Sequence, residues 1–140
     1  MDLHLTDKVI IVTGGASGIG ESIVRKLADE EAIPCIIDLN EEMASQLCNE
    51  LEKKNKKAFF FNADLTKNDL CKHAVDEVLQ KFGRLDWLVN NAGLNDGIGL
   101  ENGNYEGFIH SLEKNVGHYY SMAHFALNSL HITKGNIVNI

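Results

Sequence analysis

The 140-residue sequence has little proline, few aromatic residues and no long apolar run. It contains one proline, and 7% of its residues are aromatic. A single proline and the lack of any low-complexity tract argue against long disordered segments. No apolar segment approaches the roughly 20 residues that a membrane-spanning helix requires, so we expect no membrane partner. With 44% hydrophobic residues, the chain is long enough to form one domain around a real core.

Basic residues are fewer than acidic residues. The chain has 13 lysines and arginines against 20 acidic residues, which gives a net charge of −7. Binding to nucleic acid relies on a basic surface, so we expect no nucleic-acid partner. One basic cluster lies at the end of a predicted helix, where cations favour the helix dipole and stay hydrated: Lys53, Lys54, Lys56 and Lys57.

Cysteine is scarce, and its three positions form no C-x-x-C pair. An odd number of cysteines without metal-ligand spacing indicates buried free thiols in a reducing compartment. These residues are Cys35, Cys48 and Cys71. The segment Met1–Leu5 also lacks the basic and apolar regions of a secretory signal. We therefore expect a cytoplasmic protein.

The histidines His110, His118 and His124 share one predicted helix, but their spacing does not bring them together. His118 and His124 are six residues apart and face different ways, and His110 lies eight residues before His118. We therefore expect no metal site.

Apolar strand-like runs alternate with segments of helical spacing along the whole chain. Asn40 is a predicted helix N-cap and Gly83 a helix end, and Thr66 with Asp69 has the spacing of a capping box. The alternation predicts parallel βαβ units with right-handed crossovers. We expect a Rossmann-like doubly wound α/β sheet with strand order 3-2-1-4-5. The predicted strands are 8–13, 33–38, 57–61, 85–90 and 135–140, and the predicted helices include 18–31, 68–82 and 105–131.

The stretch from Thr13 to Gly20 lies between the first predicted strand and the first predicted helix. Glycines in such a turn allow the backbone to approach a diphosphate, and the helix start directs its free N–H groups toward the same anion. The stretch therefore predicts a dinucleotide site. The alternative is a tight strand–helix turn that binds no ligand.

Asp38 ends the second predicted strand, 18 residues beyond Gly20. An acid at this place can accept hydrogen bonds from the adenosine ribose hydroxyls, and its charge would repel a 2′-phosphate. No lysine or arginine lies beside it or in the glycine turn, so we expect NAD rather than NADP. The alternative is an aspartate that caps a turn.

Four motifs in order resemble the short-chain dehydrogenase/reductase family: Thr13-Gly14-x-x-x-Gly18-x-Gly20, Asp38, Asp64-Leu65 and Asn90-Asn91-Ala92-Gly93. Under this resemblance Asp64 binds the adenine amino group, Asn91 braces the central strands, and Ala92 and Gly93 line the path of the ribose and nicotinamide. Read alone, Asp64 is a strand-end turn residue and Asn90-Asn91 a polar turn. The resemblance implies a cofactor set of Gly14, Ser17, Gly18, Ile19, Gly20, Asp38, Asp64, Leu65, Asn91, Ala92 and Gly93.

The resemblance also implies a proton relay in which Asn115, on the long predicted helix, helps to hold a water. It calls in addition for a serine just past the fifth strand and a Tyr-x-x-x-Lys pair. Tyr105, Tyr119 and Tyr120 are followed four residues later by isoleucine, alanine and histidine. We therefore expect residues 1–140 to be the N-terminal, NAD(P)-binding Rossmann part of the family fold, truncated after the fifth strand, without the catalytic C-terminal part. The chain is then either a fragment of an enzyme or a natural truncated product.

A narrower resemblance is to the L-fucose (aldose) dehydrogenase branch, on the segments 95–100, 111–115 and 118–124. It implies a sugar or alcohol substrate, with Asn95 and Asp96 near sugar hydroxyls; loop-turn chemistry explains both residues equally well. The family also implies a homo-oligomer, dimer or tetramer, formed through the apolar face of the long helix. The predicted activity is hydride transfer between an alcohol or sugar hydroxyl and NAD. The alternative is a catalytically inactive nucleotide-binding or interaction module.

Overall fold

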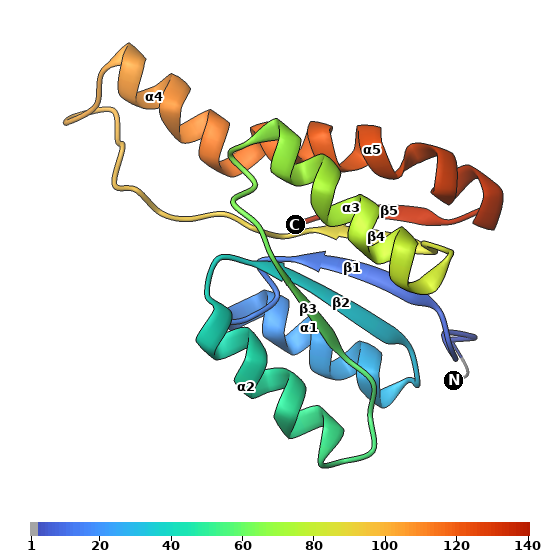
Figure 1. The fold of residues 1–140 in the computed structure, drawn as a ribbon. Coiled ribbons are helices and arrows are strands. Elements are labelled where there is room, and N and C mark those ends of the chain that lie inside the picture. Colours follow the sequence, from blue (N-terminus) through green and yellow to red (C-terminus); the bar gives the residue numbers. More distant parts are fainter. Residues whose placement is uncertain (1–2) are drawn as a thin grey trace.

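The computed structural model describes residues 3–140, whose strands form one parallel sheet (Figure 1). The order within the described sheet is β3-β2-β1-β4-β5, which confirms the predicted topology. Every neighbouring pair is parallel; for example, Ile11 of β1 lies beside Cys35 of β2 and Leu88 of β4. The strand bounds are β1 Val9–Thr13, β2 Ile33–Asp38, β3 Phe59–Asn62, β4 Trp87–Asn90 and β5 Asn136–Asn139.

Helices cover both faces of the sheet, as expected when successive side chains of a strand point to opposite sides. Ile10 and Val12 of β1 pack in the core beneath α1 (Gly18–Asp29) and α2 (Glu41–Glu52). Ile11 packs in the core on the opposite face, beneath α3 (Asn68–Phe82) and α5 (His118–Thr133). Both faces of β1 are therefore buried, as its uninterrupted apolar sequence predicts.

The helix-end predictions have mixed outcomes. Asn40 caps α2, because its side chain accepts a hydrogen bond from Met43 N–H, and Gly83 ends α3 with a left-handed φ of 69°. The predicted capping box at Thr66 and Asp69 is wrong. The Thr66 hydroxyl and backbone N–H instead donate to Asp64 Oδ1, at 2.7 and 3.0 Å. A capping box would join Thr66 to Asp69, three residues away, whereas Asp64 is only two residues away. The nearer carboxylate takes the bonds, and a local turn replaces the cap.

The helix predicted over 105–131 is present, but it is not a single regular α-helix. The segment consists of α4 (Tyr105–Leu112), a π-helical turn η1 (Glu113–Gly117) and α5. Asn115 lies within η1, where its amide bonds both back to Ser111 and across to the loop that follows β4. Such π turns insert an extra residue into a helix and occur frequently at functional sites.

The predicted free thiols agree with the structure. Cys35 and Cys71 are buried, Cys48 is partly buried, and all three are unbridged. Burial raises the pKa of the Cys71 thiol to about 11. These cysteines are therefore protonated core residues.

None of the helices within residues 3–140 has the length and apolar character needed to cross a bilayer. The same residues contain no cluster of three or more histidine, cysteine or acidic side chains able to hold a metal ion.

At the amino ends of the strands, the carboxylate of Asp86 joins β1 to the segment that leads into β4. The residue is 2% exposed. Val9 N–H and Arg84 Nε both donate to Oδ2 at 2.9 Å, Arg84 Nη2 donates to Oδ1 at 2.6 Å, and Lys8 Nζ lies 3.5 Å from Oδ1. Burial alone would raise the pKa of Asp86, but these hydrogen bonds and charges outweigh it and hold the pKa below its ordinary value. Asp86 is therefore an ionised carboxylate that holds β1 and the segment before β4 together at the amino ends of the strands.

We expect Asp86→Asn to lower the free energy of unfolding by about 2 kcal/mol at about pH 7, because the amide leaves Arg84 and Lys8 without their counter-charge. A carboxyl with a depressed folded pKa stabilises the protein above its unfolded pKa of roughly 4, and this contribution is lost as the pH falls through the folded pKa. The wild-type and Asp86→Asn stabilities should therefore converge in acid. Urea denaturation over a pH series measures both quantities.

Asp76→Asn is the matched control, because Asp76 pairs with Lys72 on the exposed face of α3. An exposed pair of this kind contributes well under about 1 kcal/mol. Equal effects of the two substitutions at neutral pH would contradict the role given to Asp86.

Candidate cofactor site

The carboxyl ends of β1 and β4 are held together by one hydrogen-bond network. Thr13 is fully buried, and its hydroxyl oxygen accepts from the N–H groups of Asn91 at 2.9 Å and Ala92 at 3.0 Å. The Asn91 amide nitrogen donates in return to the carbonyls of Thr13 at 3.0 Å and Gly14 at 3.2 Å. Asn91 therefore braces the two central strands, which is the position that the resemblance implies for it.

The glycine turn runs between this network and α1. A Cβ on Gly14, which has a φ of +63°, would lie 2.8 Å from the Ala92 Cα; a Cβ on Gly20 would clash with the Gly14 carbonyl and lie 2.6 Å from the Asn91 amide nitrogen. These two glycines permit close packing. Gly18 differs, because a Cβ built there, at a φ of +57°, would meet no described atom within 4 Å. Gly18 therefore faces open space at the start of α1.

The start of α1 is available to an anion. Ser17 is the N-cap residue, and its side chain makes no capping hydrogen bond with any residue of the described chain. The first N–H groups of a helix have no partner within the helix and carry the positive end of its dipole. A phosphate is the ligand that such an end binds most readily.

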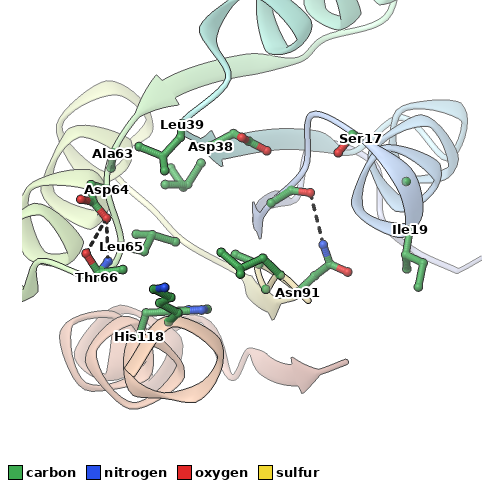
Figure 2. Close-up of a pocket in the computed structure, with 17 residues that line it drawn as sticks. Ser17, Ile19, Asp38, Leu39, Ala63, Asp64, Leu65, Thr66, Asn91 and His118 are labelled. Atoms are coloured by element: carbon green, nitrogen blue, oxygen red, sulfur yellow. Dashed lines mark hydrogen bonds between the residues drawn. The ribbon is translucent and has the colours of Figure 1, made fainter. Parts of the chain in front are cut away.

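A cleft of about 430 Å³ opens at this edge of the sheet, between the glycine turn and the loops after β2, β3 and β4 (Figure 2). Most of the predicted cofactor residues line it, including the pair Asp38 and Asp64. The predicted residues in its wall are Gly14, Ser17, Gly18, Ile19, Asp38, Asp64, Leu65, Asn91, Ala92 and Gly93. Gly20 does not line the cleft, because its space is taken up by packing against Gly14 and Asn91.

Asp38 lies in the wall next to the glycine turn. Its Oδ2 accepts from Ala16 N–H at 3.0 Å, and its Oδ1 accepts from Asn40 N–H at 3.0 Å. The carboxylate therefore also caps the turns on either side of it, as the alternative interpretation of Asp38 supposed. Since each carboxylate oxygen has more than one lone pair, these bonds leave it able to accept from a ligand.

Asp64 lies in the same wall, after β3. Hydrogen bonds from the Thr66 hydroxyl and then from the Thr66 N–H hold the pKa of Asp64 below its usual value. Both of these bonds go to Oδ1 (Figure 2). Asp64 is therefore an ionised acceptor at the edge of the cleft.

Asn115, the predicted catalytic residue, lies behind the cleft rather than in its wall. Its Oδ1 accepts from Leu94 N–H at 2.7 Å, and its Nδ2 donates to the Ser111 carbonyl at 3.0 Å. A Cβ on Gly93 would lie 2.9 Å from this Oδ1. The side chain thus positions the loop after β4, and its role in a proton relay stays a prediction.

The loop residues considered for sugar contact are engaged within the loop. Asn95 Oδ1 accepts from Gly97 N–H at 3.1 Å, and Asp96 Oδ1 accepts from the Ser111 hydroxyl at 3.1 Å. These contacts fit the loop-turn interpretation of both residues.

Sequence reasoning missed two basic residues in the wall, Lys114 and His118. His118 is 3% exposed, and both of its ring nitrogens are buried. Burial lowers the pKa of His118, and hydrogen bonds with the backbone of Ala92 and Lys114 act in the opposite direction. The available signal was their spacing: they are four residues apart, one helical turn, and on either side of Asn115.

Comparison with known proteins places this geometry among dehydrogenases. The chain is 39% identical to xanthoxin dehydrogenase of Arabidopsis thaliana, with 98% of this chain and 50% of the relative aligned. It is 36% identical to L-fucose dehydrogenase of Oryctolagus cuniculus, over 95% of this chain and 46% of the relative. The crystal structure of the Cj0485 dehydrogenase superposes with a TM-score of 0.88 at 36% identity, covering 99% of this chain and 53% of that one.

The chain thus spans about half the length of the curated relatives that it matches. The family model described as short chain dehydrogenase matches residues 8–140. This match covers the glycine turn, the strand ends and the loops that form the cleft. The chain therefore belongs to the short-chain dehydrogenase family.

Proposed function

We propose that the protein containing this chain is an NAD-dependent oxidoreductase. It would transfer a hydride between NAD and a carbon that bears an alcohol or sugar hydroxyl, with L-fucose or a related aldose as the candidate substrate. The observation that carries the proposal is the cleft at the carboxyl ends of the strands, which has an open helix start at one side and the acids Asp38 and Asp64 along its wall.

The residues present fit an adenine dinucleotide. The start of α1 beside Gly18 would hold the diphosphate, because the glycine leaves open space and the helix end supplies N–H groups. Asp38 would accept from the adenosine ribose hydroxyls and Asp64 from the adenine amino group. Ala92 and Gly93 would line the path toward the nicotinamide, whose ring supplies hydride acceptance and donation when bound.

Residues 1–140 contain the proposed cofactor-binding residues but not the Tyr-x-x-x-Lys pair that the resemblance requires for turnover. No tyrosine among residues 1–140 has a lysine four positions later. We therefore propose that residues 1–140 alone act as a nucleotide-binding module, and that oxidation of an alcohol requires the serine and Tyr-x-x-x-Lys in the same protein. The L-fucose dehydrogenases among the relatives support a sugar as substrate.

An exposed apolar surface supports the proposal that the protein is a homo-oligomer. The resemblance implies an interface through the long helix, and most large apolar side chains from α4 to α5 are exposed. Exposed apolar side chains that gather into a patch are typical of a protein–protein interface. The exposed members of this segment are Tyr105, Phe108, Ile109, Leu112, Val116, Tyr120, Leu127 and Ile132.

Gly18→Ala should weaken NAD binding by tenfold or more, about 1.4 kcal/mol, because its methyl group fills the space beside the helix start and its φ is strained. Isothermal titration calorimetry measures the affinity, and thermal denaturation measures the stability. Gly83→Ala is the matched control, since Gly83 also has a positive φ of +69° and open space but ends α3 away from the cleft. Equal losses of affinity in the two variants would argue against a phosphate site at Gly18.

NAD should bind more tightly than NADP by about tenfold or more, because the Asp38 charge opposes a 2′-phosphate. Asp38→Asn keeps the side-chain shape and one accepting oxygen but removes the charge, so the NAD-to-NADP affinity ratio should fall. Asp29→Asn, at the far end of α1, is the control and should leave the ratio unchanged. An unchanged ratio in Asp38→Asn would show that Asp38 does not select the cofactor.

The double substitution Phe108→Lys with Leu112→Lys should dissociate the oligomer, because it places two charges within the exposed apolar surface of α4. Light scattering coupled to size-exclusion chromatography measures the mass. Leu100→Lys, in the fully exposed loop before α4, should leave the mass unchanged. A monomeric wild-type protein would contradict the proposal at once.

A further inference from the structure

Lys114 is a partly buried cation for which neither the fold nor the proposed function yet accounts. Three lysines of the described chain are partly buried, and two of them have a carboxylate partner. Lys8 lies beside Asp86, and Lys56 pairs with Glu31. The ammonium group of Lys114 has no ion pair or hydrogen bond with any described residue. Because charged side chains seldom leave water without a partner, this lysine indicates an accepting group supplied by a ligand.

The charge of the cleft wall supports the same interpretation. Lys114 is the only lysine or arginine among the described residues that line the cleft, whereas the carboxylates of Asp38 and Asp64 lie in the same wall. The proposed dinucleotide carries a negatively charged diphosphate, which these acids oppose by like-charge repulsion. A cation in the wall therefore favours binding of the dinucleotide.

The position of Lys114 along the cleft indicates which part of the ligand it meets. Lys114 also lines an adjoining pocket of about 530 Å³, between the start of α3 and the η1–α5 segment. The cleft and this pocket share Leu65 and Thr66, which directly follow Asp64 in the chain. Figure 2 shows these residues on one side of the cleft and Ile19, in the first turn of α1, on the other. Lys114 therefore lies at the end of the cleft that the proposed function gives to adenine, away from the diphosphate.

Asp64 and Lys114 supply complementary hydrogen-bonding groups at this end. Both bonds that Asp64 accepts from Thr66 go to Oδ1, so Oδ2 has no partner in the described chain and can accept from a ligand. The Lys114 ammonium group can only donate. Adenine has an amino donor with a ring-nitrogen acceptor on either side of it, N1 and N7. Hypoxanthine has a carbonyl oxygen in place of the amino group, which the Asp64 carboxylate would repel.

We propose that Lys114 donates a hydrogen bond to a ring nitrogen of the bound adenine, next to the amino group from which Asp64 accepts. The two side chains together then select adenine over other bases. This inference rests on the proposed function. It gives the unpaired ammonium group a partner, and it adds a residue from η1 to a subsite otherwise built from the ends of β2 and β3.

The test titrates the full protein with NAD, with ADP-ribose, which lacks nicotinamide, and with nicotinamide mononucleotide, which lacks adenosine. Lys114→Met keeps an unbranched side chain but removes the charge and the donors. It should weaken NAD and ADP-ribose by the same factor, about tenfold, because a hydrogen bond to a charged group is lost from the half that they share. Affinity for nicotinamide mononucleotide should stay unchanged, and Lys114→Arg, which keeps a charged donor, should retain most of the NAD affinity. Isothermal titration calorimetry measures each affinity.

Two NAD analogues test the contact with the base itself. The 1,N6-etheno analogue blocks N1 and the amino group, and the 7-deaza analogue lacks N7. The analogue that lacks the contacted nitrogen should bind wild type and Lys114→Met equally well, because neither complex contains the hydrogen bond. If Lys114→Met weakened both analogues as strongly as it weakens NAD, a contact with a ring nitrogen would be excluded.

Lys67→Met is the matched control, since Lys67 lines the adjoining pocket but not the cleft. It removes the same charge close to Asp64 and should change none of the affinities. Equal losses in Lys67→Met and Lys114→Met would assign the effect to general attraction of an anionic ligand and overturn the inference. Unchanged ADP-ribose binding in Lys114→Met would also overturn it while leaving the proposed function intact. A wild-type protein that binds neither NAD nor ADP-ribose would overturn the proposed function itself.

Discussion

The cleft depends on the hydrogen bonds between Thr13 and Asn91, which hold the carboxyl ends of β1 and β4 together. These two strands are neighbours in the sheet although the β2 and β3 units separate them in sequence. The chain winds away from this point in both directions, so a crevice must open where the two strands part. A buried hydroxyl that accepts two backbone N–H groups fixes how far they part, and with it the width of the crevice.

The close packing of the glycines follows from that fixed separation. Gly14 lies against Ala92, and Gly20 lies against the Gly14 carbonyl and the Asn91 amide, so side chains at these two places would force β1, α1 and β4 apart. Gly18 has no such neighbour in the described chain and leaves the helix start open. One short turn thus combines two glycines required by packing with one that faces open space. The resemblance assigns all three to cofactor binding, which stays a prediction.

Much of the fold and of the cleft could be predicted from the sequence, because both follow from strand order. Parallel strands place their carboxyl ends at one edge, so Asp38, Asp64 and Asn91 had to meet there once the βαβ pattern was recognised. The η1 turn could not be predicted in the same way. Apolar spacing describes a continuous helix, whereas the extra residue in η1 depends on bonds from Asn115 to a loop distant in sequence. His118 was missed for a related reason, because its environment includes the backbone of Ala92, after β4, as well as that of Lys114.

The π turn connects the cofactor wall to the loop after β4. Asn115 bonds to Leu94 at the start of this loop, and Ser111, one turn earlier, bonds to Asp96 further along it. Lys114 and His118 from the same stretch of backbone enter the cleft wall. A shift of this stretch would therefore move the loop and the cleft wall together.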